Sequence, residues 1–310
     1  MQTTDWIVVG NGIAGAVLSY ELVRQGHSVL LIDEASPDSG TRYSYGGIAY
    51  WSGTDEISKT LCQEGIERHR TLADELDGDT EFREIDLLLT ILQHEDVDAV
   101  AQQYHHYAIP PQLISAQEAG ELEPQLDRSA IAAALRVTHG HVNPIKTVEA
   151  FNQAFRRLGG QHLIATVTGL VRVGNRVTGV TTPEQAYAAE QVAIAAGAYS
   201  HLLLRAVGLQ IPLYYTHAEI IETPPIDTSL RTLIMPANAE RFAMEDDVSQ
   251  PEKSPLWQTS QQIAGPILDT GVIQFLDGSL RIGQLSQVHT DLAPVSDPAT
   301  SETRLRDAIS

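Results

Sequence analysis

The stretch DWIVVGNGIAGAVLSYELVRQGHSVLLID (residues 5–33) decides the fold of this chain. Its apolar run Trp6–Val9 ends at a glycine and predicts a buried parallel strand. The following segment, Ile13–Arg24, has helical apolar spacing and stops before Gly26, a common helix terminator. Val29–Ile32 is a second apolar strand. A strand, a helix and a strand within about thirty residues predict a parallel pair with a right-handed crossover.

The turn between this strand and the helix has the pattern G-x-G-x-x-G. In such a turn, Gly10 permits the tight bend, Gly12 lets a pyrophosphate approach the backbone, and Gly15 lets the helix pack closely on the strand. The helix begins at Ile13 and Ala14, where unpaired amides and a partial positive charge attract phosphates. Because the glycines occur between a strand and a helix, they predict a dinucleotide site.

An acidic residue ends the second strand and completes the pattern. Asp33 follows Gly15 at the distance where a carboxylate accepts hydrogen bonds from an adenosine ribose, and Glu34 is next to it. A carboxylate at this position disfavours a 2′-phosphate, so NADP is not expected. The unit does not separate NAD from FAD, since both contain an ADP half.

Three later segments point to FAD by a family resemblance. They are TRYSYGGIA (41–49), for which a surface loop is the alternative, HVNP (141–144) at a helix start, and VAIAAGAYS (192–200). Together they resemble the FAD-dependent amine oxidoreductases of the D-amino acid oxidase family, nearest in pattern to glycine oxidase and sarcosine oxidase. The resemblance spans nearly the whole chain. It implies further FAD contacts at Arg42, Ser44, Gly46, Gly47, Ile48, Val167, Ala196 and Gly197.

The resemblance implies an FAD-dependent oxidoreductase that oxidises the C–N bond of a small amino acid or secondary amine. Hydride would pass from the α-carbon to the flavin, the imine would be hydrolysed, and oxygen is the expected electron acceptor. Two alternatives stay open: a flavin dehydrogenase that uses another electron acceptor, and a truncated, non-catalytic dinucleotide-binding chain. The residues identify no acid–base catalytic pair, and they leave the particular substrate open.

Candidate substrate contacts lie in the second half of the chain. Tyr214, Tyr215, His217 and Glu219 occur where the family's chain enters its substrate domain, and Arg281 lies on a predicted hairpin. Tyrosine phenols there can bind a carboxylate or an amine, and Arg281 can pair with a carboxylate. The structural alternatives are half-buried sheet residues for the first four and a solvated strand arginine for Arg281.

Two histidine pairs raise the question of a metal site. They are His105-His106 and His139-Gly-His141. Neither pair has a third ligand at a suitable spacing, so no metal is expected.

The remaining pattern predicts an α/β fold with two domains. The first is a Rossmann-like FAD-binding domain with a parallel sheet and a β-meander, and the second is an α+β substrate domain with an antiparallel sheet. The predicted bounds are 1–82 and 140–213 for the first domain, and 83–139 and 214–296 for the second. Predicted helices are Asp55–Leu76, Asp96–Tyr107, Ser115–Pro124 and Asn143–Leu158; predicted strands include Leu87–Leu92, Ala165–Val173, Arg176–Thr181, Gln191–Ala196, Val272–Phe275 and Leu280–Leu285; Glu245–Thr259 is predicted as a loop.

The composition of the chain argues against nucleic acid and anionic membranes as binding partners. The 310 residues contain 40 acidic and 20 basic side chains, a net charge of −20, which repels nucleic acid and anionic membranes. Cys62 is the only cysteine, so no intramolecular disulfide is possible. The first residues lack the basic start of a secretory signal, and we expect a cytoplasmic protein.

The C-terminal region departs from the family pattern. In the family, an Arg-Pro motif and a Gly-rich stretch follow the hairpin near Arg281, and neither follows Gly283 in this sequence. Residues 297–310 resemble the start of a helix in an incomplete segment. We therefore expect a truncated chain whose FAD-binding domain lacks its C-terminal part.

Overall fold

The computed structural model describes residues 4–250, 252–253, 255, 261–292 and 294–309. It divides into two compact units. Unit 1 is the described part of Met1–Gly46, His69–Phe82 and Val142–Ile211, and unit 2 is that of Gly47–Arg68, Arg83–His141 and Pro212–Ser310. The predicted domain bounds differ mainly at residues 47–68, and by two residues each at 140–141 and 212–213, which belong to unit 2. Residues 47–68 were expected in the first domain but belong to unit 2, where β3 (Gly47–Ile48) pairs with β6 (Ile131–His141).

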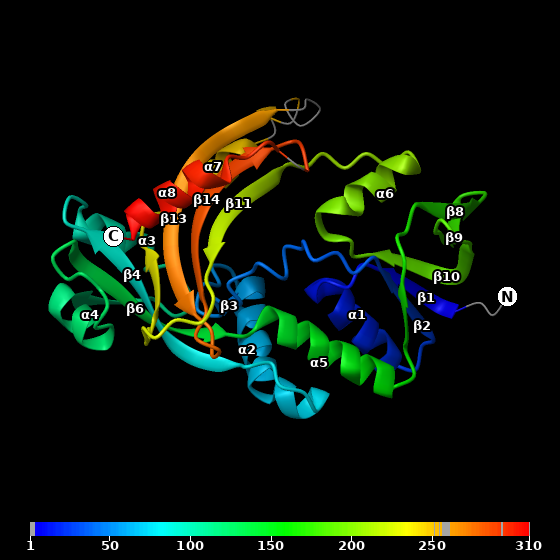
Figure 1. Cartoon of the computed structure of the whole chain (residues 1–310), viewed down its shortest axis with the longest axis horizontal. Helices are drawn as coiled ribbons and strands as arrows, with labels where there is room; N and C mark the ends of the chain where they lie inside the picture. The colour runs from blue at the N-terminus through cyan, green and yellow to red at the C-terminus, as the bar shows by residue number, and fades with distance from the viewer. Residues whose placement is uncertain (1–3, 251, 254, 256–260, 293, 310) are drawn as a thin grey trace. The chain divides into compact units, whose positions relative to one another are not determined.

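Unit 1 is built on a six-stranded sheet with the order β7-β2-β1-β10-β9-β8 (Figure 1). Strands β7, β2, β1 and β10 are parallel, and β10, β9 and β8 form an antiparallel meander. This sheet confirms the predicted parallel arrangement with a β-meander. The strands are β1 (Thr4–Val9), β2 (Val29–Asp33), β7 (Gln161–Ile164), β8 (Gly169–Val173), β9 (Arg176–Thr181) and β10 (Ala186–Ile194).

The predicted strand–helix–strand unit is present as β1, α1 (Ile13–Arg24) and β2. Strand β1 lies between β2 and β10, with Val8 opposite Leu31 on one side and Ala193 on the other. Ile7 and Val8 are completely buried, as expected for a central parallel strand covered on both faces.

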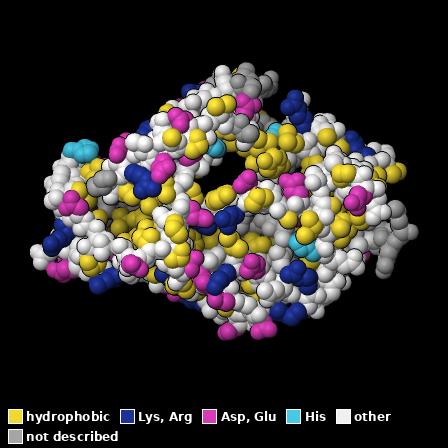
Figure 2. Space-filling view, viewed as in Figure 1, with side chains coloured by type: hydrophobic (Ala, Val, Ile, Leu, Met, Phe, Trp, Pro, Cys, Tyr) yellow, Lys and Arg dark blue, Asp and Glu magenta, His cyan; other side chains and the backbone are white. Residues whose placement is uncertain are grey.

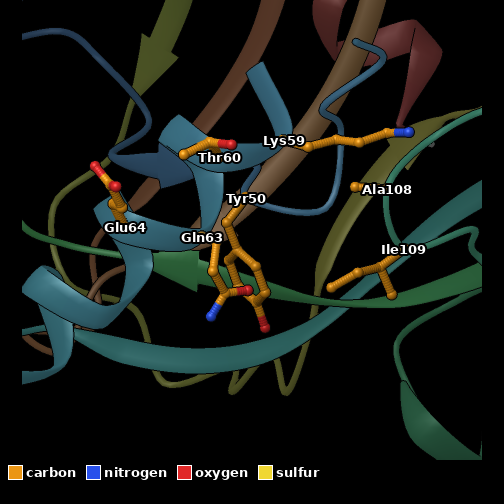
Figure 3. Close-up of a pocket in the computed structure, with 7 residues that line it drawn as sticks. All are labelled: Tyr50, Lys59, Thr60, Gln63, Glu64, Ala108 and Ile109. Atoms are coloured by element: carbon orange, nitrogen blue, oxygen red, sulfur yellow. The ribbon is translucent and has the colours of Figure 1, made fainter. Parts of the chain in front are cut away.

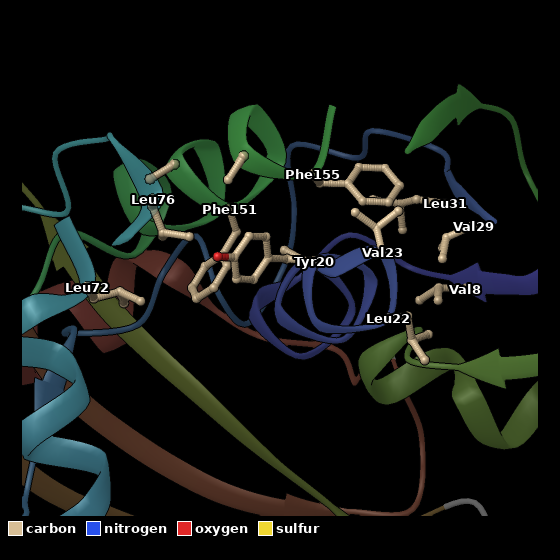
Figure 4. Packing of buried hydrophobic residues seen from close by; sticks show 13 residues of the cluster. Val8, Tyr20, Leu22, Val23, Val29, Leu31, Leu72, Leu76, Phe151 and Phe155 are labelled. Carbon is tan, nitrogen blue, oxygen red and sulfur yellow. The ribbon is translucent and has the colours of Figure 1, made fainter. Parts of the chain in front are cut away.

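The larger core of unit 1 lies between the sheet and helices α1 and α5 (Pro144–Arg157) (Figure 4). Tyr20 of α1 and Phe151 of α5 meet edge to face, with 5.6 Å between ring centroids. The Tyr20 hydroxyl donates to Glu75 at 3.1 Å, so its polar end is satisfied while the ring stays buried. A second cluster, which includes Val180, covers the opposite face of the sheet.

Unit 2 is built on a larger sheet, most of whose strand pairs are antiparallel (Figure 1). Its order is β11-β14-β13-β12-β4-β6-β3, and β5 also pairs with β6; only β12 and β4 are parallel neighbours among the described strands. The other bounds are β4 (Arg83–Leu92), β5 (Gln112–Ser115), β11 (Tyr215–Glu222), β12 (Leu233–Pro236), β13 (Gln262–Gln274) and β14 (Leu280–His289). The predicted hairpin at Asp277-Gly278 joins β13 and β14; β13 begins ten residues before its predicted start, and β14 ends four residues after its predicted end.

The remaining helices are short except for one. They are α2 (Glu56–Leu76), α3 (Val97–Gln103), α4 (Ala116–Leu122), the 3₁₀ turn η1 (Gly197–Tyr199), α6 (Ser200–Ala206), α7 (Glu240–Ser249) and α8 (Pro298–Ala308). The predicted helix Asp96–Tyr107 ends earlier in the structure, at Gln103; at its start, Asp96 is the N-cap and accepts hydrogen bonds from the amides of Asp98 and Ala99. None of the described helices is long and apolar enough to cross a membrane.

Two predicted helix starts are confirmed by their caps. The Asn143 side chain accepts hydrogen bonds from the amides of Ile145 and Lys146 at the start of α5. Ser115 and Glu118 form the predicted capping box at the start of α4.

The predicted loop at Glu245–Thr259 is wrong in its first part, because α7 continues to Ser249. Met244 and Val248 lie four residues apart on α7 and are buried with Val288 of β14. This tertiary contact stabilises a helix whose mainly polar sequence shows little periodicity. Residues 251, 254 and 256–259 of the predicted loop lie outside the described residues.

Strand β6 is the main element that the sequence pattern does not predict. It runs through unit 2 between β4 and β3, yet it contains three consecutive alanines, which are weak strand formers. Ala134 and Leu135 are 0% and 1% exposed. Burial between its neighbouring strands, and not the local strand propensity of its residues, therefore explains why residues 131–141 form a strand.

Candidate functional site

The glycine turn of unit 1 packs against the chain that follows β10. Gly10 has φ +101°, and a Cβ there would lie 2.7 Å from the carbonyl carbon of Ala195 and 2.8 Å from the Cα of Ala196. Only glycine fits this close approach. Gly197, which begins η1 with φ +54°, follows directly. The structure thus brings the predicted residues Ala196 and Gly197 beside the predicted Gly10.

The N-terminus of α1 is open to an anion. Gly12 provides no side-chain cap, and the first turn, which begins with Ile13 and Ala14, contains no acidic residue. A Cβ on Gly12 would meet one described atom within 4 Å, the Thr41 hydroxyl oxygen at 3.1 Å, which also accepts a hydrogen bond from the Ile13 amide. A Cβ on Gly15 would collide with the Gly10 carbonyl oxygen. Thr41 thus engages the Ile13 amide, and the helix dipole and the amides that follow Ile13 suit a pyrophosphate.

Asp33 organises the other side of the turn. Its carboxylate accepts hydrogen bonds from the Asn11 amide at 2.8 Å and from the Ala35 amide at 2.7 Å. Each carboxylate oxygen keeps a further acceptor position, which a ribose hydroxyl can use. The buried side-chain oxygen of Asn11 has no partner among the described residues. Glu34, which is exposed, accepts a hydrogen bond from Thr166 at 3.2 Å.

The other residues of unit 1 that are predicted to contact FAD make different local interactions. The Arg42 guanidinium lies over the Tyr43 ring, 5.2 Å from its centroid. The Ser44 hydroxyl accepts a hydrogen bond from the Gly46 amide at 3.1 Å, and Gly46 has φ +71°. Val167 packs with Ala196 against the second core cluster of unit 1. The structure places Val167 and Ala196 together, and Thr41, the neighbour of Arg42 in the chain, contacts the glycine turn at Gly12 and Ile13.

Gly47 and Ile48, also predicted to contact FAD, form the edge strand β3 of unit 2. Here the structure adds His139, which the sequence indicates only as part of a histidine pair. The His139 ring points at Gly47, and its Nδ1 accepts a hydrogen bond from Trp51 Nε1 at 3.1 Å. Burial lowers the pKa of His139 to about 4. Only the Gly46-Gly47 pair hinted at this contact, since close approach requires glycine.

The predicted substrate contacts divide between two faces of the β11–β14 pair. The hydroxyl of Tyr214, just before β11, lies 2.8 Å from Ser249 Oγ and donates to the Glu245 carbonyl oxygen at 3.1 Å, both on α7. On the other face lie Tyr215 and His217, which are two residues apart on β11. The His217 ring lies edge-on to the ring of His289, with 6.3 Å between the ring centroids. Burial raises the pKa of the Tyr215 phenol.

Glu219 and Arg281 are engaged elsewhere. Glu219 accepts a hydrogen bond from Ser301 of α8 at 2.7 Å. Arg281 is only 5% exposed, so the alternative of a solvated strand arginine is wrong. Its guanidinium is 3.2 Å from Glu222 and lies 4.6 Å from the centroid of the Phe275 ring. Arg281 is opposite Glu222 at the far end of the strand pair from Tyr215, so the two do not share one contact region.

The two histidine pairs have no metal-like arrangement. His105 and His106 are exposed, and the His106 ring lies 4.4 Å from that of Tyr107. His141 Nδ1 faces Arg83 Nε at 3.4 Å. Among the described residues, no group of three or more His, Cys, Asp or Glu is placed to hold a metal ion.

A pocket of about 480 Å³ lies in unit 2 beside the first half of α2 (Figure 3). None of the predicted site residues lines it. Its lining mixes one lysine, one glutamate and neutral side chains, namely Tyr50, Lys59, Thr60, Gln63, Glu64, Ala108 and Ile109. On the face shown in Figure 2, the described Lys and Arg side chains are scattered among Asp and Glu without forming an extended basic patch.

The family model described as "FAD dependent oxidoreductase" matches residues 5–309. The chain belongs to this family. FAD is the cofactor of the family, and the uncapped helix, the open Gly12 and the Asp33 carboxylate of this structure fit its ADP half.

Two relatives and one solved structure support the assignment. The chain is 25% identical over 269 residues to hydrogen cyanide synthase subunit HcnC of Pseudomonas aeruginosa, covering 72% of this chain and 64% of the relative. It is also 25% identical over 248 residues to glycine oxidase of Geobacillus kaustophilus, covering 76% of this chain and 65% of the relative. The chain thus spans about two thirds of the length of these relatives. The crystal structure of the Geobacillus kaustophilus glycine oxidase has the same fold, with a TM-score of 0.78 at 22% identity, covering 100% of this chain and 78% of that chain.

Proposed function

We propose that this family member oxidises the C–N bond of a small amino acid or secondary amine, with FAD as oxidant and oxygen as electron acceptor. The observation that carries the proposal is the family match over 5–309 together with a glycine turn that is open to a pyrophosphate. The 25% identity to a glycine oxidase supports an amino acid substrate.

The residues of unit 1 have defined roles in this proposal. The amides at the start of α1 hold the pyrophosphate, and Gly12 leaves space for it. Asp33 accepts hydrogen bonds from the adenosine ribose while the Asn11 and Ala35 amides fix its orientation. The chemistry that FAD supplies when bound is acceptance of a hydride from the substrate's α-carbon, after which water hydrolyses the imine.

Tyr215 and His217 are the substrate contacts that we retain as proposals. They share one face of β11, and the His289 ring lies beside that of His217. A phenol and an imidazole on one sheet face offer hydrogen-bond donors to a substrate carboxylate. Tyr214 and Arg281 are supported less, because α7 and Glu222 already engage them.

Purified protein tests the proposal through its flavin. With added FAD, we expect a flavin absorption spectrum that bleaches without oxygen when glycine, sarcosine or a D-amino acid is supplied, and hydrogen peroxide in air. Bleaching without peroxide in air would instead indicate a dehydrogenase with another electron acceptor. A protein that takes up no FAD would contradict both activities.

A matched pair of variants separates specific from unspecific FAD uptake. Gly12→Asp places a carboxylate where the pyrophosphate would lie, so FAD binding should be lost through charge repulsion and steric exclusion. Gly40→Asp adds the same charge at an exposed glycine with no described atom within 4 Å of its Cβ position, and should leave FAD binding unchanged. Equal binding by both variants would contradict the proposed cofactor site.

A further inference from the structure

The pocket beside the first half of α2 is formed entirely by residues of unit 2 (Figure 3). One side of α2 lines it, Tyr50 lies next to this helix, and Ala108 and Ile109 line the opposite side. The Ala108 amide donates to the Gly53 carbonyl oxygen at 2.8 Å. The Ile109 amide donates to the Trp51 carbonyl oxygen at 3.1 Å. These backbone hydrogen bonds join the side of Ala108 and Ile109 to the segment that leads into α2.

The start of α2 is fixed against the same segment. A Cβ on Gly53 would lie 2.8 Å from both the backbone nitrogen and the Cα of Lys59, so only glycine permits this close approach of two stretches of backbone. The Tyr50 hydroxyl donates to Glu84 of β4 at 3.0 Å, which fixes the phenol as well. The pocket is therefore preformed, and a ligand does not have to order it. Its volume of about 480 Å³ is in the range of sites for small molecules.

Opposite charges lie at the two ends of the α2 side. In Figure 3, the Lys59 side chain extends toward the end where Ala108 and Ile109 lie, and the Glu64 carboxylate is at the other end. Gln63 and Tyr50 lie between them. Because an α-helix rises 1.5 Å per residue, positions 59 and 64 are about 7.5 Å apart along the helix axis. The pocket thus presents an ammonium and a carboxylate at well separated points.

Both charges can accept a further partner. Lys59 Nζ is 3.7 Å from Glu56 Oε1, which is too long for a hydrogen bond, and the Glu56 side chain is 96% exposed. Glu64 makes no hydrogen bond or ion pair with another residue of the part of the chain that the structure describes. The Gln63 amide nitrogen donates one N–H to Glu67 at 3.0 Å, so its second N–H and its carbonyl oxygen can serve a ligand.

We propose that this pocket binds a small zwitterion whose ammonium and carboxylate groups are separated by several bonds, of the class of ω-amino acids and dipeptides. The ligand carboxylate pairs with Lys59, the ligand ammonium pairs with Glu64, and the chain between them lies along Gln63 and Tyr50. An α-amino acid carries both charges on one carbon and is too short to reach both residues. The site is independent of the proposed oxidation, since none of the predicted cofactor or substrate contacts lines it.

A series of ligands tests the required separation of charges. The full chain, with and without FAD, is titrated with 6-aminohexanoate, glycylglycine, glycine, hexanoate and hexylamine while the methyl NMR signal of Ile109 is followed. We expect 6-aminohexanoate and glycylglycine to shift this signal with a Kd of about 1 mM, because both charged side chains are partly exposed. The other three ligands should bind about fivefold more weakly, since each engages only one end of the pocket. The signal of Ile226, an exposed isoleucine of unit 2 outside the lining, should not shift.

Two variants with the same change of charge separate this site from the general field of the protein. Glu64→Gln should weaken binding of 6-aminohexanoate about fivefold and leave that of hexanoate unchanged. Glu56→Gln removes a competitor for Lys59 and should tighten binding of both ligands about twofold. Lys59→Met should weaken both about fivefold. Thermal unfolding verifies that each variant is folded.

Three results would overturn the inference. The first is an Ile109 signal that neither zwitterion shifts. The second is glycine or hexanoate binding as tightly as 6-aminohexanoate. The third is an equal change in affinity for 6-aminohexanoate in Glu64→Gln and Glu56→Gln. Flavin binding and turnover do not enter these measurements, so their outcome is separate from that of the proposed function.

Discussion

The candidate site at the glycine turn of unit 1 consists mainly of backbone groups, whereas the candidate site on the β11–β14 pair of unit 2 consists of side chains. In unit 1, backbone amides and glycines form the site. Gly10 lies so close to Ala195 and Ala196 that no side chain fits at position 10. In unit 2, the candidates Tyr215 and His217 are side chains on a sheet face whose backbone does not depend on them. Substitution of Gly10 should therefore act through folding, and substitution of Tyr215 or His217 through binding alone.

Gly10→Ala should produce the largest effect. The new methyl group meets the Ala195–Ala196 backbone and the residue keeps φ +101°, so we expect a loss of about 4 kcal/mol in unfolding free energy. Gly26→Ala is the control, because Gly26 has φ +91° but no described atom within 4 Å of its Cβ position, and should cost about 1 kcal/mol. Chemical denaturation measures both, and equal losses would contradict the steric explanation.

Acid should destabilise unit 2 through His139. Its pKa is about 4 in the folded protein and about 6.5 when unfolded, so the unfolded chain binds the proton first. Stability from this residue is complete above pH 6.5, falls as the pH decreases, and is lost below pH 4, by up to about 3 kcal/mol. The difference in unfolding free energy between the unmodified chain and His139→Asn should shrink over this range. A constant difference would contradict the burial of a neutral imidazole.

Glu123→Gln should destabilise unit 2 by about 2 kcal/mol. The carboxylate is completely buried, and one oxygen accepts hydrogen bonds from the amides of Arg231 and Thr232 at 2.7 and 3.1 Å. In the Gln variant, an NH₂ group at the position of this oxygen would face the amide N–H groups of Arg231 and Thr232, and none of these donors would have an acceptor. Glu121→Gln, an exposed change on the same helix, should stay within about 0.5 kcal/mol. Hydrogen exchange should report the loss in peptides of unit 2 before those of unit 1, and the reverse order would contradict this assignment.

Asp33→Asn should weaken FAD binding about tenfold without unfolding the chain. The amide cannot accept from the Asn11 amide, the Ala35 amide and a ribose as fully as the carboxylate does. Asp38→Asn changes an exposed carboxylate five residues later and should leave the affinity unchanged. Fluorescence titration with FAD distinguishes the two, and an unaffected Asp33→Asn variant would argue against ribose binding here.

The smallest effect is expected at the tyrosine pair. Tyr215→Phe should raise the KM for the substrate about threefold by removing one hydrogen bond. Tyr214→Phe should leave KM unchanged and lower stability by about 1 kcal/mol, because its hydroxyl bonds α7 at Ser249 and Glu245. Steady-state kinetics with thermal unfolding tests both. A KM effect at Tyr214 alone would place the substrate on the opposite face of β11.

The features that the sequence predicts correctly depend on interactions between residues that are close in the chain. The glycine turn before α1, the position of Asp33 at the end of β2 and the helix starts at Ser115 and Asn143 are set by residues close in the chain, and the structure has each of them at its predicted place. Strand β6 and helix α7 could not be read in this way, because burial against distant partners decides them. The contact between Trp51 and His139 joins residues 88 positions apart, so no local pattern contains it.

The pairing of β1 has a consequence for how the chain is made. Strand β2 leaves the ribosome soon after β1, but β10, the other neighbour of β1, ends only at Ile194. At about 5–20 residues per second, the β10 side of β1 waits about ten to forty seconds for its partner. During that time the apolar strand WIVV presents an unpaired edge. Slower synthesis or a chaperone that covers residues 6–9 should therefore alter the yield of native protein.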